Sequence, residues 1–272
     1  MTGEMTSESN IQSLLEIMAK LRDPKTGCPW DLAQQFDSIV PFTLEEAYEV
    51  ADTIERVAFD ELPSELGDLL FQVVFYCQLG QEQGLFDFGV VVDKICHKLI
   101  SRHPHVFDAQ DFQSSEAMKQ NWESLKEKER QARQLHSELD DIPLALPALT
   151  RSMKIQKRVA RVGFDWNSLE PVVAKVQEEI VEVLDEVNQV PVSQDKITDE
   201  MGDLLFAVVN MARHLEVDPE QALRLANRKF ERRFRGVEEK VAAVGGVMAE
   251  QTLSQLDEHW NAVKQEERDT YP

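Results

Sequence analysis

Two copies of an eleven-residue pattern occur in this chain, and this internal duplication limits the folds it can adopt more than any other feature. Residues 65–75 read ELGDLLFQVVF and residues 200–210 read EMGDLLFAVVN, so eight of the eleven positions are identical. A second matching pair lies upstream, at residues 44–52 (LEEAYEVAD) and 177–185 (QEEIVEVLD). The repeat period is far longer than that of a solenoid, so the pattern indicates two similar domains.

Matching residues occur in the same order in both halves, at offsets between 131 and 138 residues. The pairs are Glu46 and Glu179, Glu65 and Glu200, Lys98 and Lys229, and Trp122 and Trp260. Between the halves, Pro143 and Pro147 cannot occupy a helix interior. We therefore predict an N-terminal domain over residues 1–139 and a C-terminal domain over residues 148–272, with a linker at about residues 140–147.

The apolar pattern predicts an all-α fold. Ile11, Leu14 and Met18 belong to a stripe with the period of a helix. Further helices are expected from Thr43 to about Ala58, from Pro63 onward, over residues 88–101 and over residues 115–135. We find no convincing alternation of period two and no Asn-Gly turn, so no strands are predicted.

The charge balance excludes several classes of partner. The chain has 50 Asp and Glu against 29 Lys and Arg, for a net charge of −21, which argues against general binding to nucleic acid or to anionic membranes. A bound cation can still bring in a small polyanion. With three cysteines in no CxxC pair, no signal-peptide core and no apolar run of spanning length, we expect a reduced cytoplasmic protein.

Paired carboxylates are the strongest sign of chemistry. Glu179 and Glu182 share one helix face, and Glu200 and Asp203 have the same spacing on the next predicted helix. If these helices pack antiparallel, four like charges converge, which is unfavourable without a cation. Oxygen ligands of this kind suit Mg²⁺ or Mn²⁺. The first copy repeats the set, as a second possible metal site, at Glu46, Glu49, Glu65 and Asp68.

The acidic residues also fit other interpretations. A single Glu pair is most often a solvated helix face, and residues 43–46 also fit a capping box in which Glu46 caps its own helix. The repetition of both pairs beside strongly apolar segments favours the metal site. A di-iron helical bundle requires Glu-x-x-His, and none of the six histidines has Glu three residues before it.

Basic residues near the carboxylates suit a phosphate ligand. Lys229 and Arg233 lie one helical turn apart, an arrangement that fits phosphate oxygens, although a solvated basic face is about equally common. Lys175 and Lys196 each lie four residues before a carboxylate of the second copy. The first copy has Phe42 and Glu61 at the matching positions. We therefore expect the chemistry in the second domain.

These residues belong to a longer series of motifs that resembles a known family. The motifs are GCPWD (residues 27–31), LEEAYEV (44–50), ELGDLLFQVVF (65–75), RHPHVF (102–107), NWESLKEKE (121–129), RVGFDW (161–166), EEIVE (178–182), DEMGDLLFAVVN (199–210) and NRKFERRF (227–234). Over essentially its full length the chain resembles MazG, the all-α nucleoside triphosphate pyrophosphohydrolases, in their two-domain bacterial form.

The resemblance implies a reaction, an assembly and a set of site residues. The reaction would convert NTP or dNTP and water to a nucleoside monophosphate and pyrophosphate with Mg²⁺. The assembly would be a homodimer in which four-helix sites form between subunits. The metal ligands would be Glu179, Glu182, Glu200 and Asp203, and the nucleotide contacts Lys175, Lys196, Lys229, Arg233 and Trp260.

As a mechanism we expect carboxylates to hold one to three Mg²⁺ ions that lower the pKa of the attacking water. Either Glu179 or Glu182 is the expected general base. Two alternatives stay open: a hydrolase restricted to one non-canonical nucleotide, and a non-enzymatic dimeric scaffold. The sequence shows no polar residue that would read a base, and for Trp260 core packing is the commoner role.

Overall fold

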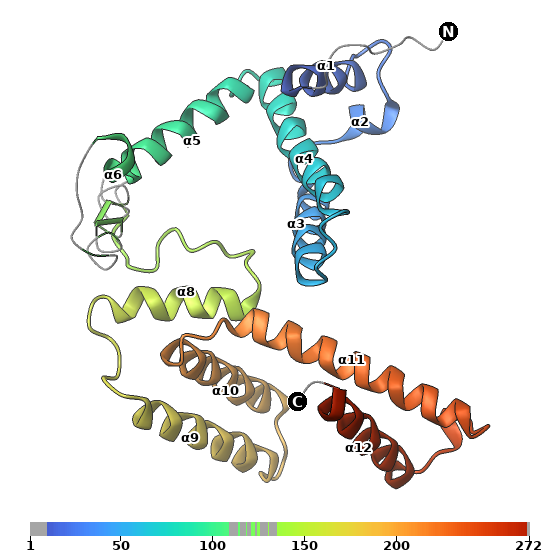
Figure 1. Cartoon of the computed structure of the whole chain (residues 1–272). Coiled ribbons are helices and arrows are strands. Elements are labelled where there is room, and N and C mark those ends of the chain that lie inside the picture. Colours follow the sequence, from blue (N-terminus) through green and yellow to red (C-terminus); the bar gives the residue numbers. More distant parts are fainter. Residues whose placement is uncertain are drawn as a thin grey trace. The chain divides into compact units, whose positions relative to one another are not determined.

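The computed structural model describes residues 10–108 and 135–270, together with seven residues between these ranges. Those seven are Ser114, Met118, Asn121, Trp122, Ser124, Leu125 and Arg130. All regular elements of the described residues are helices, which confirms the predicted all-α class (Figure 1). No helix among them has the length and apolarity needed to span a bilayer. Most of the helix predicted over residues 115–135 lies outside the described residues.

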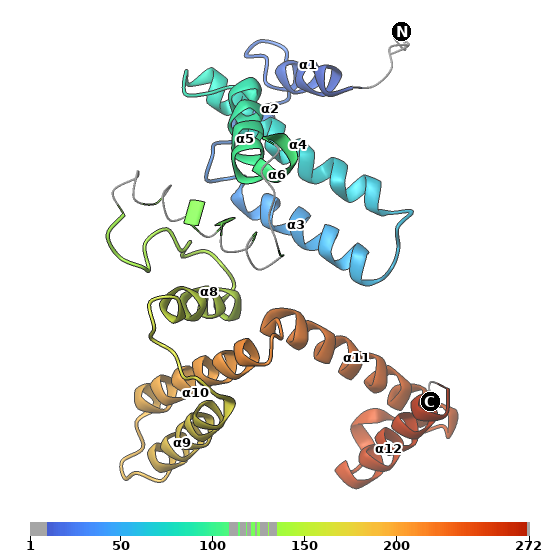
Figure 2. The ribbon, with the colours of Figure 1, turned by 60° about the vertical axis from the view of Figure 1, so that its left-hand side comes forward.

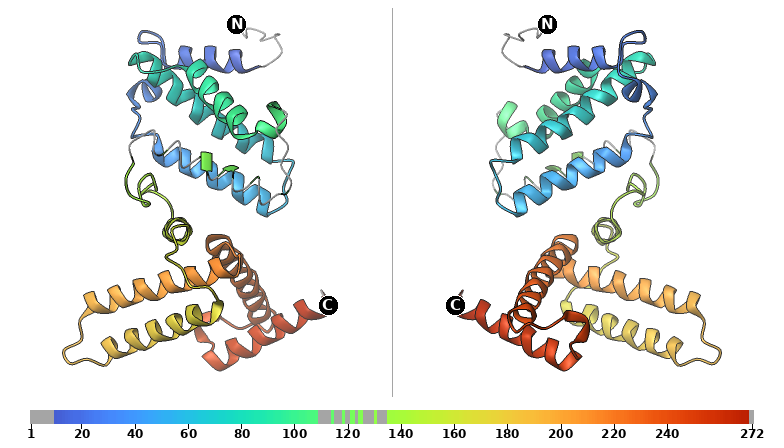
Figure 3. Two further views of the ribbon diagram at one scale, coloured as in Figure 1. Left: turned by 90° about the vertical axis from the view of Figure 1, so that its left-hand side faces the viewer. Right: turned by 90° about the vertical axis from the view of Figure 1, so that its right-hand side faces the viewer.

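The chain divides into two compact units, Met1–Glu127 and Lys128–Pro272. Over residues 10–108 the first unit contains α1 (Ile11–Leu21), α2 (Pro29–Ala33), α3 (Val40–Glu55), α4 (Leu62–Glu82), α5 (Phe88–Arg102) and α6 (Pro104–Phe107). Helices α3 and α4 form an antiparallel hairpin, and α1 and α5 also pack on α4 (Figure 3). The core of this unit consists of Met18, Ile39, Val74, Phe75 and Leu79.

The start of α3 differs from the prediction. The helix begins at Val40, three residues before Thr43, because Pro41 fits the first turn, where its missing N–H is not needed. The Thr43 hydroxyl donates to the Ile39 carbonyl at 3.1 Å and is hydrogen-bonded to the Tyr76 hydroxyl at 2.9 Å. Thr43 therefore lies inside the helix, and the capping-box interpretation of Glu46 is wrong.

The second unit repeats the hairpin. Its helices are α8 (Ala148–Ala160), α9 (Leu169–Val187), α10 (Gln194–His214), α11 (Pro219–Ala243), the 3₁₀ turn η1 (Met248–Glu250) and α12 (Leu253–Thr270). Helices α9 and α10 lie side by side in all views, with α8 packed on α10 and α12 packed on α11 (Figure 2). Val172 and Val183 of α9 and Ala207 and Val209 of α10 are buried, and α9 and α10 pack on each other. This packing fixes which side of each helix carries the acids.

Candidate metal and nucleotide site

Three carboxylates converge where α9 faces α10. One oxygen from each of Glu179, Glu182 and Glu200 lies within 4.8 Å of the other two. The spacing of three residues places Glu179 and Glu182 on one face of α9, and the hairpin brings α10 against that face. In the first unit one oxygen from each of Glu46, Glu49 and Glu65 likewise lies within 4.8 Å of the other two. The two hairpins thus bring three of the four predicted carboxylates together in each half.

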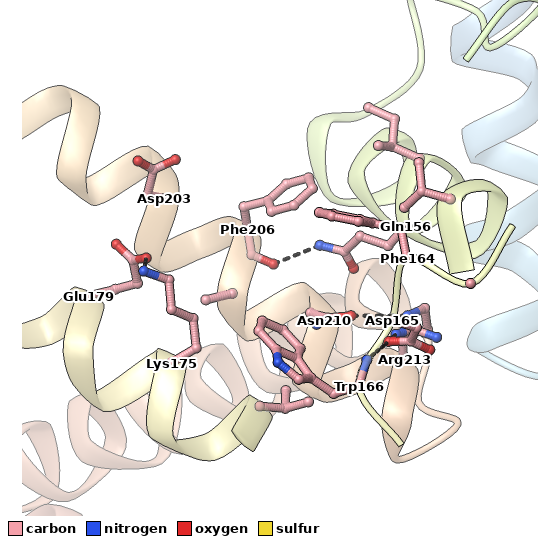
Figure 4. A pocket seen from close by; sticks show the side chains of 15 residues that line it. Gln156, Phe164, Asp165, Trp166, Lys175, Glu179, Asp203, Phe206, Asn210 and Arg213 are labelled. Carbon is pink, nitrogen blue, oxygen red and sulfur yellow. Dashed lines mark hydrogen bonds and ion pairs between the residues drawn. The ribbon is translucent and has the colours of Figure 1, made fainter. Parts of the chain in front are cut away.

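The fourth predicted carboxylate of each set is close by. Asp203 lines a cavity together with Glu179, and Figure 4 shows both side chains at the same end of it. The charge of Asp203 helps to raise the pKa of Glu200, after the larger effect of burial. Asp68 acts in the same way on Glu46, whose pKa is raised first by burial and then by Asp68 and Glu49.

The electrostatics of the second cluster oppose full ionisation. Burial raises the pKa of Glu182, and the neighbouring Glu179 carboxylate raises it further, while Lys175 acts in the opposite direction. Burial and the charge of Asp203 raise the pKa of Glu200. Like charges held this close favour a proton or a cation between them. The cluster is therefore ready to exchange protons for a metal ion.

Glu179 supplies the clearest test of whether a metal fits. The residue is only 4% exposed, and its Oε1 forms an ion pair with Lys175 Nζ at 2.7 Å. Its other oxygen, Oε2, is buried and has no hydrogen-bond partner among the described residues. A buried carboxylate oxygen without a partner is costly. A divalent cation held with Glu182 and Glu200 would supply that partner, and an all-oxygen set suits Mg²⁺.

The two lysines of the second copy take different positions. Lys175 bridges Glu178 and Glu179 at 2.9 and 2.7 Å, and these contacts raise its pKa, so it is protonated at neutral pH. Lys196 instead pairs with Glu186 Oε1 at 3.3 Å and is largely exposed. It therefore approaches α9 without contacting the three clustered carboxylates.

At the matching positions the first unit has different contacts. The Phe42 ring packs edge-on against Trp30, with ring centroids 5.8 Å apart. Glu61 accepts from Arg56 at 2.7 Å. Glu46 thus has a bulky apolar residue one turn before it, where Glu179 has a paired ammonium group.

The remaining predicted nucleotide contacts form a separate cluster on α11 and α12. Arg233 Nε donates to Glu267 Oε2 at 2.8 Å, and its guanidinium lies 5.9 Å from the centre of the Trp260 ring. Trp260 also packs on Phe230 and on the apolar core between the two helices. Lys229 is exposed on α11. No hydrogen bond, ion pair or ring contact among the described residues joins this cluster to the carboxylates of α9 and α10.

A cavity of about 680 Å³ adjoins the carboxylates, between α8, α9, α10 and the loop at residues 163–166 (Figure 4). Three of its polar residues were not among the predicted site residues. They are Gln156, Asn210 and Arg213. One signal for Asn210 was present in the sequence, because it replaces Phe75 in an otherwise closely matched pattern.

An ionic network attaches the cavity loop to the C-terminal end of α10. Asp165 accepts a short hydrogen bond from Arg213 and is hydrogen-bonded to His214 Nε2 at 3.0 Å. Burial favours its neutral form, but the bonds from Arg213 and His214 outweigh burial and lower the pKa of Asp165. The same Arg213 donates from Nε to Asn210 Oδ1 at 3.0 Å. The network therefore holds the loop at residues 163–166 against α10 and fixes the side chain of Asn210, which lines the cavity.

Comparison with known proteins identifies relatives over the whole chain. A family profile described as the MazG nucleotide pyrophosphohydrolase domain matches residues 34–107 and 167–237, and each segment contains one carboxylate set. The nucleoside triphosphate pyrophosphohydrolase of Escherichia coli (strain K12) is 55% identical over 96% of this chain and 99% of that protein. The nucleoside triphosphate pyrophosphohydrolase/pyrophosphatase MazG of Thermotoga maritima is 39% identical over 93% of this chain and 95% of that protein.

Proposed function

The chain belongs to the MazG nucleotide pyrophosphohydrolase family, and on that premise we propose that it hydrolyses nucleoside triphosphates to monophosphate and pyrophosphate at the α9–α10 site. The observation that carries the assignment to this site is the environment of Glu179. A solvated helix face would leave this residue exposed, whereas it is buried with one oxygen on Lys175 and the other unpaired. This argues for a ligand and against a purely structural scaffold.

In this proposal Glu179, Glu182, Glu200 and Asp203 hold the metal, which we take to be Mg²⁺. When bound, Mg²⁺ would offset phosphate charge and lower the pKa of a nearby water. The ion pair from Lys175 holds the Glu179 carboxylate in one orientation. Of the two carboxylates on α9, either Glu179 or Glu182 would accept the proton of the attacking water, since one oxygen of each lies within 4.8 Å of the other and both can reach the same water.

The cations of the second unit neutralise the polyphosphate. Lys196 lies on the same helix as Glu200, and we assign it to the leaving pyrophosphate. Arg233 uses Nε for Glu267, which leaves its two terminal nitrogens for phosphate oxygens. Because the cluster on α11 and α12 contacts none of the described carboxylates of α9 and α10, we propose that a homodimer completes the site. Lys229, Arg233 and Trp260 would then face the nucleotide in the assembled protein.

We assign the first unit a minor part in this reaction. Its carboxylates Glu46, Glu49 and Glu65 have a separation like that of the second set, so they can hold a cation. The positions of Lys175 and Lys196 are occupied there by Phe42 and Glu61. Without those cations a triphosphate would meet four carboxylates with less compensating charge.

Hydrolysis in H₂¹⁸O with Mg²⁺ tests the reaction itself. Attack on the α-phosphorus breaks its bond to the bridging oxygen and places ¹⁸O in the monophosphate, with unlabelled pyrophosphate formed in equal amount. We expect this outcome by mass spectrometry for ATP and for dNTPs. Formation of nucleoside diphosphate and inorganic phosphate would mean attack on the γ-phosphorus and would refute the proposal.

A further inference from the structure

The cavity beside the carboxylates has two chemically different ends. At one end lie Lys175, Glu179 and Asp203, and at the other lie the aromatic side chains of Phe164 and Trp166 (Figure 4). A nucleotide has the same polarity, since charged phosphates lie at one end and a flat base with apolar faces at the other. We propose that this cavity holds the nucleoside of the substrate and that Gln156 and Asn210 hydrogen-bond its base. The proposal rests on the hydrolase function proposed for the same site.

The size and lining of the cavity fit a nucleoside. Its volume of about 680 Å³ lies within the range of small-molecule pockets, roughly 300–1,000 Å³. Phe164, Trp166 and Phe206 contribute to the lining, and aromatic rings stack on the faces of any base. The aromatic wall therefore offers affinity for bases without choosing among them.

Gln156 supplies an acceptor that lacks a partner. The residue is 4% exposed, and its Nε2 donates to the Phe206 carbonyl at 2.8 Å. That bond identifies the nitrogen, so the other amide atom is the oxygen. Oε1 is buried without a hydrogen-bond partner among the described residues, which is unfavourable unless a donor reaches it. An N–H group on the edge of a base would be such a donor.

Asn210 supplies the complementary donor. Its Oδ1 accepts from Arg213 Nε at 3.0 Å, so its amide nitrogen is the group left for another partner. Arg213 is itself held by Asp165, which fixes the orientation of this amide. The wall thus offers one acceptor and one donor. Adenine, guanine, cytosine, thymine and uracil each carry a donor beside an acceptor on one edge, so this pair recognises bases as a class.

The first unit has different residues at the positions of the two amides. At the position that matches Asn210 it has Phe75, which is 1% exposed and packs in the core with Met18. The residue 135 positions before Gln156, the same offset, is Leu21. Where the second unit has two amides beside an open space, the first unit has an aromatic ring and a leucine. Copying these residues into the second unit therefore gives a direct test.

Asn210→Phe fills the cavity with the side chain that the first unit uses. We expect the KM for ATP and for dNTPs to rise by at least about tenfold, because binding of the nucleoside is lost. The Ki of AMP as a product inhibitor should rise equally. The Ki of pyrophosphate, which carries no nucleoside, should stay within about twofold of the wild-type value.

Gln156→Leu removes the acceptor with little change in size, and it decides the matter if Asn210→Phe does not fold. We expect a rise of about threefold to tenfold in the KM for ATP and in the Ki of AMP. Gln221→Leu is the matched control, because that side chain is exposed at the start of α11. Its kinetic constants should equal those of the wild type.

Calorimetric titration with AMP separates this proposal from the hydrolase function. If the wild type binds AMP and both cavity variants bind it more weakly, the nucleoside site stands even when no NTP is hydrolysed. If the wild type hydrolyses NTPs but both folded variants keep its KM and its AMP affinity, the hydrolase function stands and the nucleoside site is refuted.

Discussion

Glu179 and Glu182 lie three residues apart on one helix, yet their surroundings differ. Glu179 is buried and ion-paired with Lys175 at 2.7 Å. Glu182 has its pKa raised, first by burial and then by Glu179. A site with one ion-paired carboxylate and a neighbour whose pKa is raised is suited both to holding a cation and to accepting a proton.

The raised pKa of Glu182 predicts a pH-dependent stability without divalent cations. The folded chain binds the proton of Glu182 more tightly than the unfolded chain does. The unfavourable contribution of ionised Glu182 to folding stability is therefore absent below the ordinary pKa of Glu. It develops as the pH rises through the raised pKa. Glu182→Gln should therefore melt at a higher temperature than the wild type at pH 7.5 in EDTA, and the difference should close toward pH 4.

Mg²⁺ provides the control for that comparison. Addition of Mg²⁺ at pH 7.5 should stabilise the wild type more than Glu182→Gln, because the cation removes the repulsion that the substitution has already relieved. Equal melting temperatures for the two proteins at every pH, with and without Mg²⁺, would contradict this description of the cluster.

At the scale of elements, most helices follow from local pattern. The stripe beginning at Ile11 became α1, and the helix predicted over residues 88–101 is α5, which ends one residue later. The error at α3 arose because Thr43 resembles a capping residue, whereas Pro41 and a contact with distant Tyr76 decide the boundary. The convergence of carboxylates was also predictable, since a spacing of three residues and an antiparallel hairpin suffice.

Other parts of the site depend on packing that local pattern does not encode. The cavity is formed by α8, α9, α10 and a loop together, so it cannot be predicted from the sequence of any one of these segments. Gln156 is a candidate hydrogen-bond acceptor for the base only because its Nε2 donates to the Phe206 carbonyl, which leaves Oε1 for the ligand. Likewise, the contacts of Arg233 with Glu267 and Trp260 require the pairing of α11 with α12.

Arg22 connects three elements of the first unit and predicts a local stability effect. This buried residue donates to both oxygens of Glu82 at 2.8 and 2.7 Å and to the Asp31 carbonyl. Arg22→Met should destabilise the unit by about 2–4 kcal/mol, since it leaves a partly buried carboxylate and a carbonyl unpaired. Hydrogen exchange of the full chain should show the loss at α1 and α4.

Arg56 offers the matched control for Arg22. It pairs with Asp52 and Glu61, but all three side chains are about half exposed, so Arg56→Met should lower the stability much less than Arg22→Met does. Because Arg22 lowers the pKa of Glu82, its contribution is present at neutral pH and is lost as the pH falls through that lowered value. Equal effects of the two substitutions would show that Arg22 does not connect these helices.

At the scale of the whole molecule, large apolar side chains on the outer faces of α9 and α10 are exposed. Leu184 is 54% and Leu205 is 51% exposed, and Ile180 and Met201 lie one turn from them. Apolar surface of this kind is typical of an interface. It supports the proposed homodimer, which would also bring more cations to the carboxylates.

Analytical ultracentrifugation tests this assembly. The wild type should sediment with about twice the chain mass of 31.1 kDa. The double change Leu184→Glu with Leu205→Glu should give monomers and lower pyrophosphate release by at least about tenfold, because each site would lose its partner's groups. Leu144→Glu, on a side chain that is 84% exposed before α8, is the control and should remain dimeric. A wild-type monomer with full activity would refute the assembly.

We propose that one of the two similar carboxylate clusters, the one on α9 and α10, performs the reaction. Pyrophosphate release from Glu179→Gln and from Glu46→Gln, matched substitutions at equivalent positions, tests this proposal. We predict that Glu179→Gln lowers the rate by at least about 100-fold and that Glu46→Gln stays within about threefold of the wild type. A wild-type rate for Glu179→Gln, or a loss confined to Glu46→Gln, would contradict the account.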